Sequence, residues 1–387
     1  MIRSAATIQA ILFLFAALIF LVVPVQSQTA WEFSGYATDL PTYQQQNPTF
    51  ARLLSADDSQ FLNLSRLRLR PTLLLWDDAR LALEYEITTL FQSSSSTFLE
   101  TPETSRRQIT SLRWTPVHEP HFDISHFVDR LYFRKNFQSA SIVVGRQRIA
   151  WGTGRIWNPT DLFSPINPAS FDKIEKDGAD AISLKCYFGS FTDLEMVYNP
   201  EDEFRQSNGA ARFHTNFAEY DMSVLGGIFD RDLVLGGDFA GNLFTAGLRG
   251  EGIVRFEKHS TVEKYILDLD YQFTSKLYAL IEYQFNGEGS GERTSYELQR
   301  LLTAEILNLA RNYIAVSTTY QLHPLVTAGV TWNANLDDGS GFFSPSVMYS
   351  AAANADLGAG GLLTYGGDLS EYWYYPTSIY VKGTFYF

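Results

Sequence analysis

The chain is poor in cysteine and, beyond its first residues, has no long apolar run. Cys186 is the single cysteine among 387 residues, which excludes an internal disulfide and leaves no cysteine for lipid attachment near the N-terminus. No stretch after Ser27 reaches the roughly 20 apolar residues that a membrane-spanning helix needs. Basic residues are also in deficit. The formal net charge is −13, which argues against nucleic acid as a partner.

The first residues are typical of a secretory signal peptide. Arg3 supplies a positive start, and an apolar run of about 16 residues follows from Ile8 to Val23, which is shorter than a spanning helix. Small residues at the cleavage position lie within Val25-Gln26-Ser27. We therefore predict a cleaved signal peptide at 1–27 and a single domain over 28–387. A retained membrane anchor is the alternative.

Aromatic residues and alternating segments are abundant. The chain contains 29 Phe and 21 Tyr, and these recur in stretches in which apolar and polar residues alternate. The clearest stretches are 81–88, 181–188, 265–274, 277–286 and 326–333. Each has about ten residues, the length that crosses a bilayer at a tilt of roughly 45°. Because a barrel strand gives only every second residue to the lipid, hydropathy alone misses such strands.

The last ten residues carry this alternation to the end of the chain. One face would present Ile379, Val381, Phe385 and Phe387, and the other Tyr380, Lys382, Thr384 and Tyr386. A soluble edge strand can alternate in the same way, but it rarely ends on three aromatic residues in four. The pattern is typical of the last strand of an outer-membrane barrel. We expect Phe385 and Phe387 to form an assembly signal for the barrel-assembly machinery.

Along the chain, short connections between the alternating segments take turns with connections that are mostly longer. The short ones are 76–78, 138–139, 189–190, 218–219, 240–242, 275, 323–324 and 352–354. The others are 39–60, 92–125, 150–178, 199–208, 286–311, 337–341 and 366–377, together with two brief ones at 230–231 and 258–261. Short periplasmic turns and longer external loops are the rule in bacterial barrels.

This alternation predicts an all-β fold, a transmembrane antiparallel up-and-down β-barrel. We expect about 18 strands, with 16 as the second choice, and both termini in the periplasm. Residues 107–114 could form a further strand, but we assign them to the 92–125 loop because the alternation of loop lengths otherwise fails. One helix is predicted in an external loop from Glu292 to Asn312, where apolar residues recur at helical spacing and Thr294 with Glu297 fits a capping box. It could plug the mouth or pack on the rim.

Arginines recur on one face of neighbouring predicted strands. They alternate with apolar residues and are Arg66, Arg68, Arg70, Arg130, Arg134, Arg146 and Arg148. An arginine that faced lipid would cost about 2–4 kcal/mol at mid-bilayer, so this face is expected to line the lumen. We predict a basic pore-lining wall with Glu84 and Glu86 as partial counter-ions. Bracing of the barrel and selection of the permeant are equal alternatives for its role.

The segment 151–178 follows this wall and is predicted to fold inward as a constriction loop. Three prolines fix its path, and its aromatic side chains are too apolar to stay in water. The residues expected to form the constriction are Trp151, Arg155, Trp157, Asp161, Asp172 and Glu175. Asp161, Asp172, Glu175 and Asp177 could oppose the arginines. Such an arrangement places a transverse field across a pore, which is how charged rings select solutes.

Part of this region resembles a known group of proteins. The stretch Val-Gly-Arg-Gln-Arg-Ile-Ala-Trp-Gly at 144–152, followed by Asn158-Pro159-Thr160-Asp161, is similar to the Gly-Arg-Gln, Trp-Gly, Asn-Pro-x-Asp signature of a porin-like group of outer-membrane proteins. That group includes alginate-export-like channels and uncharacterised barrels, and the preceding residues 129–133 also fit it. The resemblance implies a monomeric channel-type barrel without a catalytic set.

These observations predict an outer-membrane channel of a Gram-negative bacterium, surrounded by outer-membrane lipid, for passive transport of small polar or anionic solutes. Sugar acids are candidate permeants. The alternative is a plugged barrel that handles lipid or other hydrophobic cargo or serves an export system. We expect neither an enzyme nor a cofactor. His118, His121 and His126 lack the spacing of a closed metal site, and no Ser–His–Asn constellation can be assembled from the sequence.

Overall fold

The computed structural model describes residues 30–53, 57–76, 78–94, 107–164, 175, 177–201, 203, 206–302 and 306–387. The predicted signal peptide and Asp172 lie outside the described residues. None of the helices in the described part of the chain is long and apolar enough to cross a membrane.

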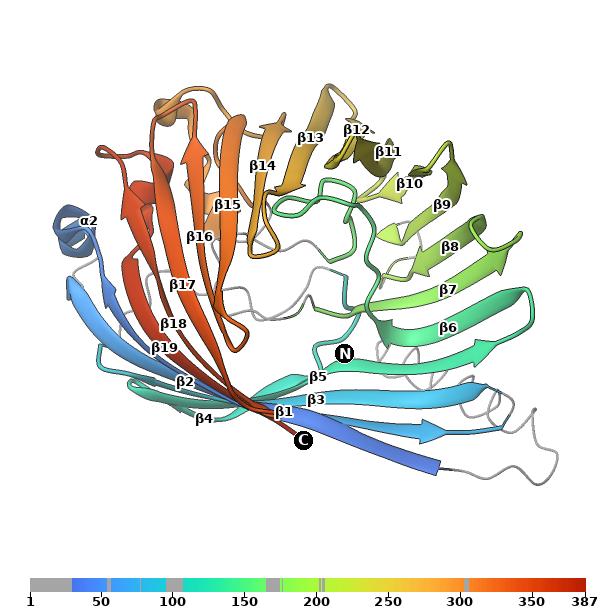
Figure 1. Cartoon of the computed structure of the whole chain (residues 1–387), viewed down its shortest axis with the longest axis horizontal. Coiled ribbons are helices and arrows are strands. Elements are labelled where there is room, and N and C mark those ends of the chain that lie inside the picture. Colours follow the sequence, from blue (N-terminus) through green and yellow to red (C-terminus); the bar gives the residue numbers. More distant parts are fainter. Residues whose placement is uncertain are drawn as a thin grey trace.

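Antiparallel strands make up most of the described chain (Figure 1). The first nine are β1 (Ala30–Gln45), β2 (Ser59–Leu74), β3 (Ala79–Gln92), β4 (Arg113–Glu119), β5 (Phe122–Asn136), β6 (Ala140–Gln147), β7 (Ala179–Tyr187), β8 (Asp193–Asn199) and β9 (Asn208–Phe217). The others are β10 (Tyr220–Phe229), β11 (Asp232–Leu243), β12 (Ala246–Phe256), β13 (Thr261–Gln272), β14 (Leu277–Asn286), β15 (Asn312–His323), β16 (Val326–Asn335), β17 (Gly341–Ala352), β18 (Ala355–Tyr365) and β19 (Thr377–Tyr386).

Eighteen of these strands close into a barrel, which confirms the predicted fold class and strand number. At the seam, β19 pairs with both β18 and β1, and backbone hydrogen bonds of 2.9 and 3.1 Å join Phe387 to Gly35. β3 pairs directly with β5, whereas β4 pairs with the first part of β5. β4 is therefore an additional strand inside the 92–125 loop. The prediction that residues 92–125 are entirely loop was wrong. The prediction that this region adds no strand between β3 and β5 in the barrel wall was right.

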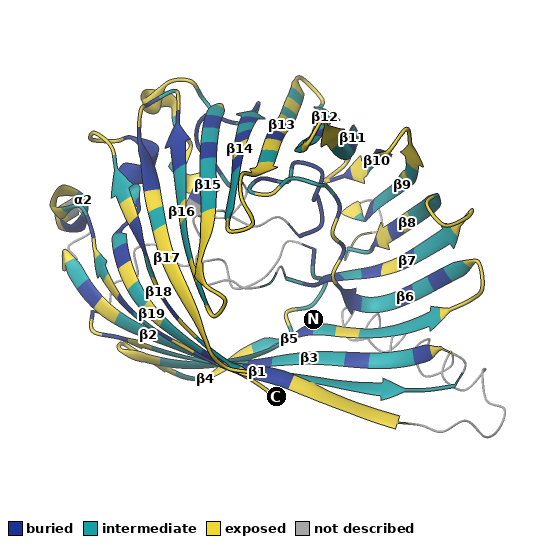
Figure 2. Ribbon diagram, in the orientation of Figure 1, coloured by how far each residue is buried: buried dark blue, intermediate teal, exposed yellow. Residues whose placement is uncertain are grey.

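Exposed and buried residues alternate along parts of the barrel strands, as the colours on β13 show (Figure 2). On β13, Leu267 is 53% exposed and the next residue, Asp268, is fully buried. On β19, Val381 and Phe385 are exposed while Thr384 is buried. A slip of one residue would exchange the two faces. The predicted register is therefore confirmed on both strands.

The connections follow the predicted alternation of short and longer lengths, but the turn expected at 240–242 was misplaced, because β11 continues to Leu243 and the turn follows at 244–245. The helix predicted from Glu292 to Asn312 is wrong in extent. The described part of this loop contains a 3-10 turn, η2 (Arg293–Ser295), and a short helix, α3 (Leu298–Leu302), and β15 already begins at Asn312. Apolar residues at helical spacing, such as Leu301, Ile306 and Leu309, are instead buried against other loops and strand ends. Another short helix, α2 (Pro48–Leu53), lies in the β1–β2 connection.

The largest cluster of buried apolar side chains lies where the segment after β6 packs inside the barrel. This segment crosses the interior in Figure 1, with β6 before it and β7 after it. Three side chains of the segment pack against apolar residues of β10 to β12, among them Phe229 and Val234. The three are Ile149, Trp151 and Phe163. A barrel interior is usually polar. The apolar side chains of the inward segment therefore find an apolar patch on the wall that matches them.

Candidate functional site

The inward segment, residues 148–164, buries its aromatic side chains inside the barrel. Trp151 and Trp157 are buried, and Phe163 is completely so. The Phe163 ring meets Trp151 edge-on with the centroids 5.2 Å apart and lies 5.0 Å from Phe229 of β10. The Trp151 indole N–H donates a hydrogen bond of 3.1 Å to the Glu195 carboxylate on β8. The predicted inward folding is thus what the described residues show.

Glu251 of β12 holds one part of this segment by its backbone. Its carboxylate accepts hydrogen bonds from the amides of Thr153, Gly154 (3.0 Å) and Thr160 (3.2 Å). Glu251 is buried. A buried carboxylate without donors would be very costly, so the three amides stabilise the charge and the charge fixes the segment.

Glu282 of β14 holds the adjoining part in the same way. Its carboxylate accepts from the amides of Arg155 (2.9 Å), Ile156 (3.2 Å) and Trp157 (2.7 Å). Glu282 is fully buried, on the interior face next to Asp268. Two wall carboxylates therefore bind six backbone amides of residues 153–160. This arrangement fixes the position of the segment across the interior.

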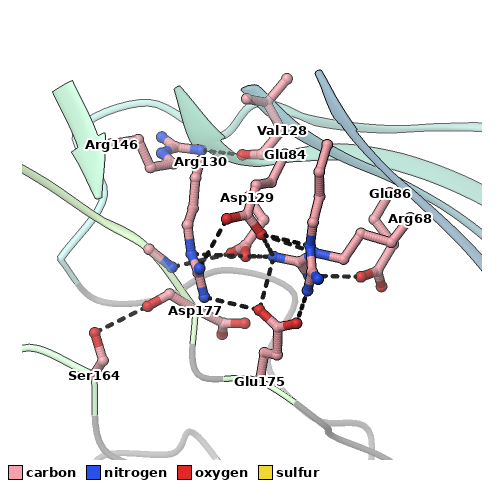
Figure 3. A network of polar contacts seen from close by, with 12 residues as sticks. Arg68, Glu84, Glu86, Val128, Asp129, Arg130, Arg146, Ser164, Glu175 and Asp177 are labelled. Carbon is pink, nitrogen blue, oxygen red and sulfur yellow. Dashed lines mark hydrogen bonds and ion pairs between the residues drawn. The ribbon is translucent and has the colours of Figure 1, made fainter. Parts of the chain in front are cut away.

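On another part of the wall, Arg68 of β2 is the centre of an ion-pair network (Figure 3). Its guanidinium lies 2.7 Å from Glu84 and 2.9 Å from Glu86, both on β3, and also contacts Asp129 on β5. Arg68 is 3% exposed and Asp129 is 2% exposed. Asp129 in addition accepts a hydrogen bond of 3.0 Å from the amide of Gly178, just before β7. The network thus ties three strands to the end of the inward connection.

The remaining members extend the network on both sides of Arg68. Arg66 lies 2.7 Å from Glu86. Arg130 of β5 pairs with Glu84 at 2.9 Å and with Glu175 at 3.0 Å, and Glu175 also binds Arg70. Glu175 belongs to the predicted constriction loop, and its approach to the arginines was predicted.

The charges of this network compensate one another. Four arginines (Arg66, Arg68, Arg70 and Arg130) meet four carboxylates (Glu84, Glu86, Asp129 and Glu175). The sequence predicts a basic wall with Glu84 and Glu86 as partial counter-ions and with carboxylates of the constriction loop, Glu175 among them, opposite it. That expectation understated the acidic side, because Asp129 follows Val128 at a shift in the β3–β5 register and simple alternation misassigns it.

The structure separates the other predicted wall residues from this network. Arg146 binds Asp180 at 2.8 Å and donates to the carbonyl oxygen of Val128 at 3.0 Å, beside the network in Figure 3. Arg148 lies beyond the end of β6 and is exposed. Arg134 lies four residues beyond Arg130 along β5, with its guanidinium carbon 5.8 Å from the centroid of the Tyr132 ring. The seven predicted arginines therefore form several groups.

The predicted carboxylates of the constriction loop also differ in their roles. The Asp161 carboxylate accepts a hydrogen bond of 3.2 Å from the amide of Ser164, and it is buried. Asp177 accepts the Ser164 hydroxyl through its backbone carbonyl at 2.9 Å. Arg155 uses its amide to bind Glu282, while its side chain is exposed. Glu175 is the carboxylate of this loop that joins the arginine network, at 3.0 Å from Arg130.

Three histidines singled out in the sequence have separate partners. His118 lies 2.7 Å from Asp123, the ring of His121 lies 3.0 Å from the carbonyl oxygen of Gln92, and His126 lies 2.8 Å from the Tyr85 hydroxyl. Within the described ranges no three His, Cys, Asp or Glu side chains are grouped as a metal site would require.

Sequence reasoning missed the wall carboxylates that hold the inward segment. Alternation places Glu282 on the interior face of its strand, and a buried carboxylate always demands donors. The same is true of Glu251. The missing information was the source of those donors, because they come from backbone amides about a hundred residues away in the chain.

The longer loops form a second polar cluster around Glu371, which lies in the 3-10 turn η3 (Glu371–Tyr374). Its carboxylate accepts hydrogen bonds from the amide of Leu309 (3.0 Å), the Tyr313 hydroxyl (2.6 Å) and the Asn335 side chain (2.9 Å). The amide of Glu371 donates to Asp338 at 2.8 Å. Burial raises the pKa of Glu371 to about 7, although its hydrogen-bond donors oppose that rise. The cluster joins three loops.

The terminal aromatic residues lie on the outside of the barrel, as predicted. Phe385 and Phe387 are exposed, and the Phe387 ring stacks on Phe33 of β1 with the centroids 5.9 Å apart. Their role as an assembly signal stays a prediction.

Comparison with known proteins adds evidence on the fold. No protein-family model matches the chain, and neither does any curated protein. Among solved structures, OccAB2 of Acinetobacter baumannii is similar with a TM-score of 0.56 and 9% identity, over 92% of this chain and 98% of that chain. A triple mutant of Rhodopseudomonas blastica porin is similar with a TM-score of 0.50 and 8% identity, over 92% of this chain and 100% of that one. At such identities the likeness shows the fold, a closed antiparallel barrel of the kind found in porins.

Proposed function

We propose that this protein is an outer-membrane channel through which small polar or anionic solutes pass passively, with sugar acids as candidate permeants. The observation that carries the proposal is the distribution of charge. The arginines and carboxylates gather on the interior face, while the outside is apolar and aromatic. A wall of this kind suits water and solutes inside and lipid outside.

The inward segment supports a channel in which passage is restricted. It is held across the interior by Glu251 and Glu282, and Glu175 of the same connection reaches the arginine network. Charged groups on a narrowed path act on solutes at close range, where selection is strongest. The porin-like fold also favours a channel over an enzyme.

A second candidate is a plugged barrel for lipid or other hydrophobic cargo, or one that serves an export system. It is favoured by the apolar packing of Trp151 and Phe163 against β10 to β12. This packing would be expected of a fixed plug as well as of a constriction. The two functions differ in whether ions pass through the folded protein.

We further infer a place in the outer membrane of a Gram-negative bacterium, with both termini in the periplasm and insertion by the barrel-assembly machinery. The surrounding partner is membrane lipid, no nucleic acid is involved, and a monomer is the favoured state. This orientation can be tested by introducing cysteines into the short turns or the longer loops and labelling intact cells from outside. Labelling of the short turns from outside intact cells would reverse it.

The decisive experiment is conductance of the purified protein in a planar bilayer. A channel should give discrete current steps. In a salt gradient, its reversal potential should shift towards the equilibrium potential of the anion. Heat-unfolded protein at the same concentration is the control. A folded, heat-modifiable barrel that gives no current steps would exclude a channel, and binding of an apolar fluorescent probe would then support the cargo alternative.

A further inference from the structure

A second group of arginines lies on the interior face, closer to the short turns than the compensated network. Arg80 is four residues before Glu84 on β3, and Arg134 is four residues after Arg130 on β5. Even spacing keeps each on the face of its network neighbour, about 13 Å further along the strand. The two arginines are directly opposite each other in the β3–β5 pairing. Like charges in that position destabilise a sheet unless something binds between them.

The surroundings of this pair supply no counter-charge within the cross-strand row. Arg80 is paired with Leu74 on β2, and Arg134 is paired with Val143 on β6. The next interior row towards the network places Thr72 opposite Ala82 and Ala82 opposite Tyr132. These neighbours are neutral.

No ion pair within 4.0 Å joins Arg80 or Arg134 to a carboxylate of the described chain, whereas Arg68 has four such partners. The Nε atoms of both arginines are buried without a hydrogen-bond partner among the described residues, and both side chains are half-buried. Among the described residues, the carboxylates nearest to Arg80 along the chain are Glu84, which is already bound to Arg68 and Arg130, and Asp78 in the β2–β3 turn. Two arginines thus lie in register on neighbouring strands, and no carboxylate of the described chain is within ion-pair distance of either.

We propose that Arg80 and Arg134 form an oxyanion-binding site inside the barrel, near its short-turn end, which takes the carboxylate or phosphate group of a permeating solute. A guanidinium presents a planar fork of N–H donors that matches two oxygens of such a group. Two opposed forks would hold the anion from both sides and remove the repulsion between them. The site rests on the proposed channel function and assigns the anion preference to these two residues.

The site can be tested with inorganic phosphate and acetate as probes. Phosphate added to the chloride solution on the short-turn side should reduce the single-channel current of the wild-type protein in a saturable way. Arg80→Gln and Arg134→Gln should each weaken this effect roughly tenfold, because a hydrogen-bonded charged contact of about 1.5 kcal/mol corresponds to that factor. The double variant should abolish it. Acetate tests the carboxylate in the same assay, and a response to either probe supports the site.

Lys185→Gln provides a matched control. Lys185 is another interior cation near the short turns, but it is bound to Asp193 at 3.2 Å, so its loss changes net charge without opening the site. Phosphate inhibition should persist in this variant. Arg134→Lys keeps the charge but loses the fork, and it should bind phosphate less well than the wild type. Equal binding in Arg134→Lys and wild type would overturn the site, because the effect would then be a matter of charge alone.

Calorimetric titration of the detergent-solubilised protein with phosphate separates this inference from the proposed function. Phosphate binding that is present in the wild type and lost in the double variant supports the site even if the barrel conducts no ions. Conductance with no phosphate or acetate effect, or with the same effect in the wild type and the double variant, overturns the site and leaves the channel intact.

Discussion

Two groups of arginines on the same face of β3 and β5 differ in their surroundings. Around Arg68 each guanidinium meets a carboxylate, so the group is compact, buried and neutral as a whole. Arg80 and Arg134 are opposite each other, their other cross-strand neighbours are apolar, and no carboxylate of the described chain is within ion-pair distance. The comparison teaches that the number of arginines on a barrel wall does not measure its attraction for anions. What matters is which arginines lack an internal counter-ion.

The largest expected difference between the two groups is in stability. Arg68→Ala leaves Glu84, Glu86 and Asp129 close together without their shared cation, and breaking such a buried group costs about 3–5 kcal/mol. Arg80→Ala removes one of two opposed like charges and should leave stability unchanged or slightly higher. Urea unfolding in detergent, followed by the shift on heat-modifiable gels, measures both. Equal losses in the two variants would show that the groups do not differ as described.

The next effect concerns the carboxylates that hold the inward segment. Glu282→Ala leaves the amides of Arg155, Ile156 and Trp157 without their acceptor, at about 1–3 kcal/mol for each buried group that water does not reach. We expect the segment to leave its position, with a clear change in single-channel conductance and noise. Glu282→Gln keeps one acceptor oxygen and should have a smaller effect. Identical conductance in wild type and Glu282→Ala would mean that the segment does not restrict the current.

A smaller effect, on ion selectivity, is expected when one carboxylate is removed from the network around Arg68. Glu175→Gln removes one carboxylate that pairs with Arg70 and Arg130, so it exposes positive charge on the path. The ratio of anion to cation permeability should rise by roughly a factor of two, measured from the reversal potential in a salt gradient. Arg80→Gln should move the same ratio in the opposite direction. If both variants leave the reversal potential unchanged, the permeating ions do not pass either group.

The same comparison shows which features the sequence could predict. Alternation such as that of Leu267 with Asp268, and the regular order of short and longer connections, are local consequences of a barrel in a membrane, so fold and register could be derived. The grouping of Arg66, Arg68, Arg70 and Arg130 also followed, because up-and-down order makes successive strands neighbours. The counter-ions could not all be derived, since Asp129 depends on an irregular pairing in β5.

Other features depended on contacts between distant parts of the chain. The helix expected from Glu292 onwards was overestimated because Leu301, Ile306 and Leu309 are apolar at helical spacing, yet they are buried by Phe342 and Tyr372 of other elements. In the same way, the acceptors for the amides of the inward segment lie on β12 and β14. Periodicity describes one segment at a time and does not report what the segment packs against.

The smallest expected effect is a pH response of the longer loops, away from both arginine groups. Burial raises the pKa of Glu371 to about 7, above the usual value of 4.5. The folded state therefore binds this proton more readily than the unfolded loop does, so the contribution of Glu371 to loop stability is complete below about pH 4.5 and is lost as pH rises through about 7. The groups that face it are the Tyr313 hydroxyl, the Asn335 amide and, through the backbone amide of Glu371, Asp338.

Hydrogen exchange of residues 366–376 should accelerate between pH 5 and pH 8 more than the intrinsic chemical rate does, while the strands around Arg68 and Arg80 keep their protection. Glu371→Gln should remove this excess, because an amide does not titrate in that range. An excess that persists in Glu371→Gln would assign the response to another group.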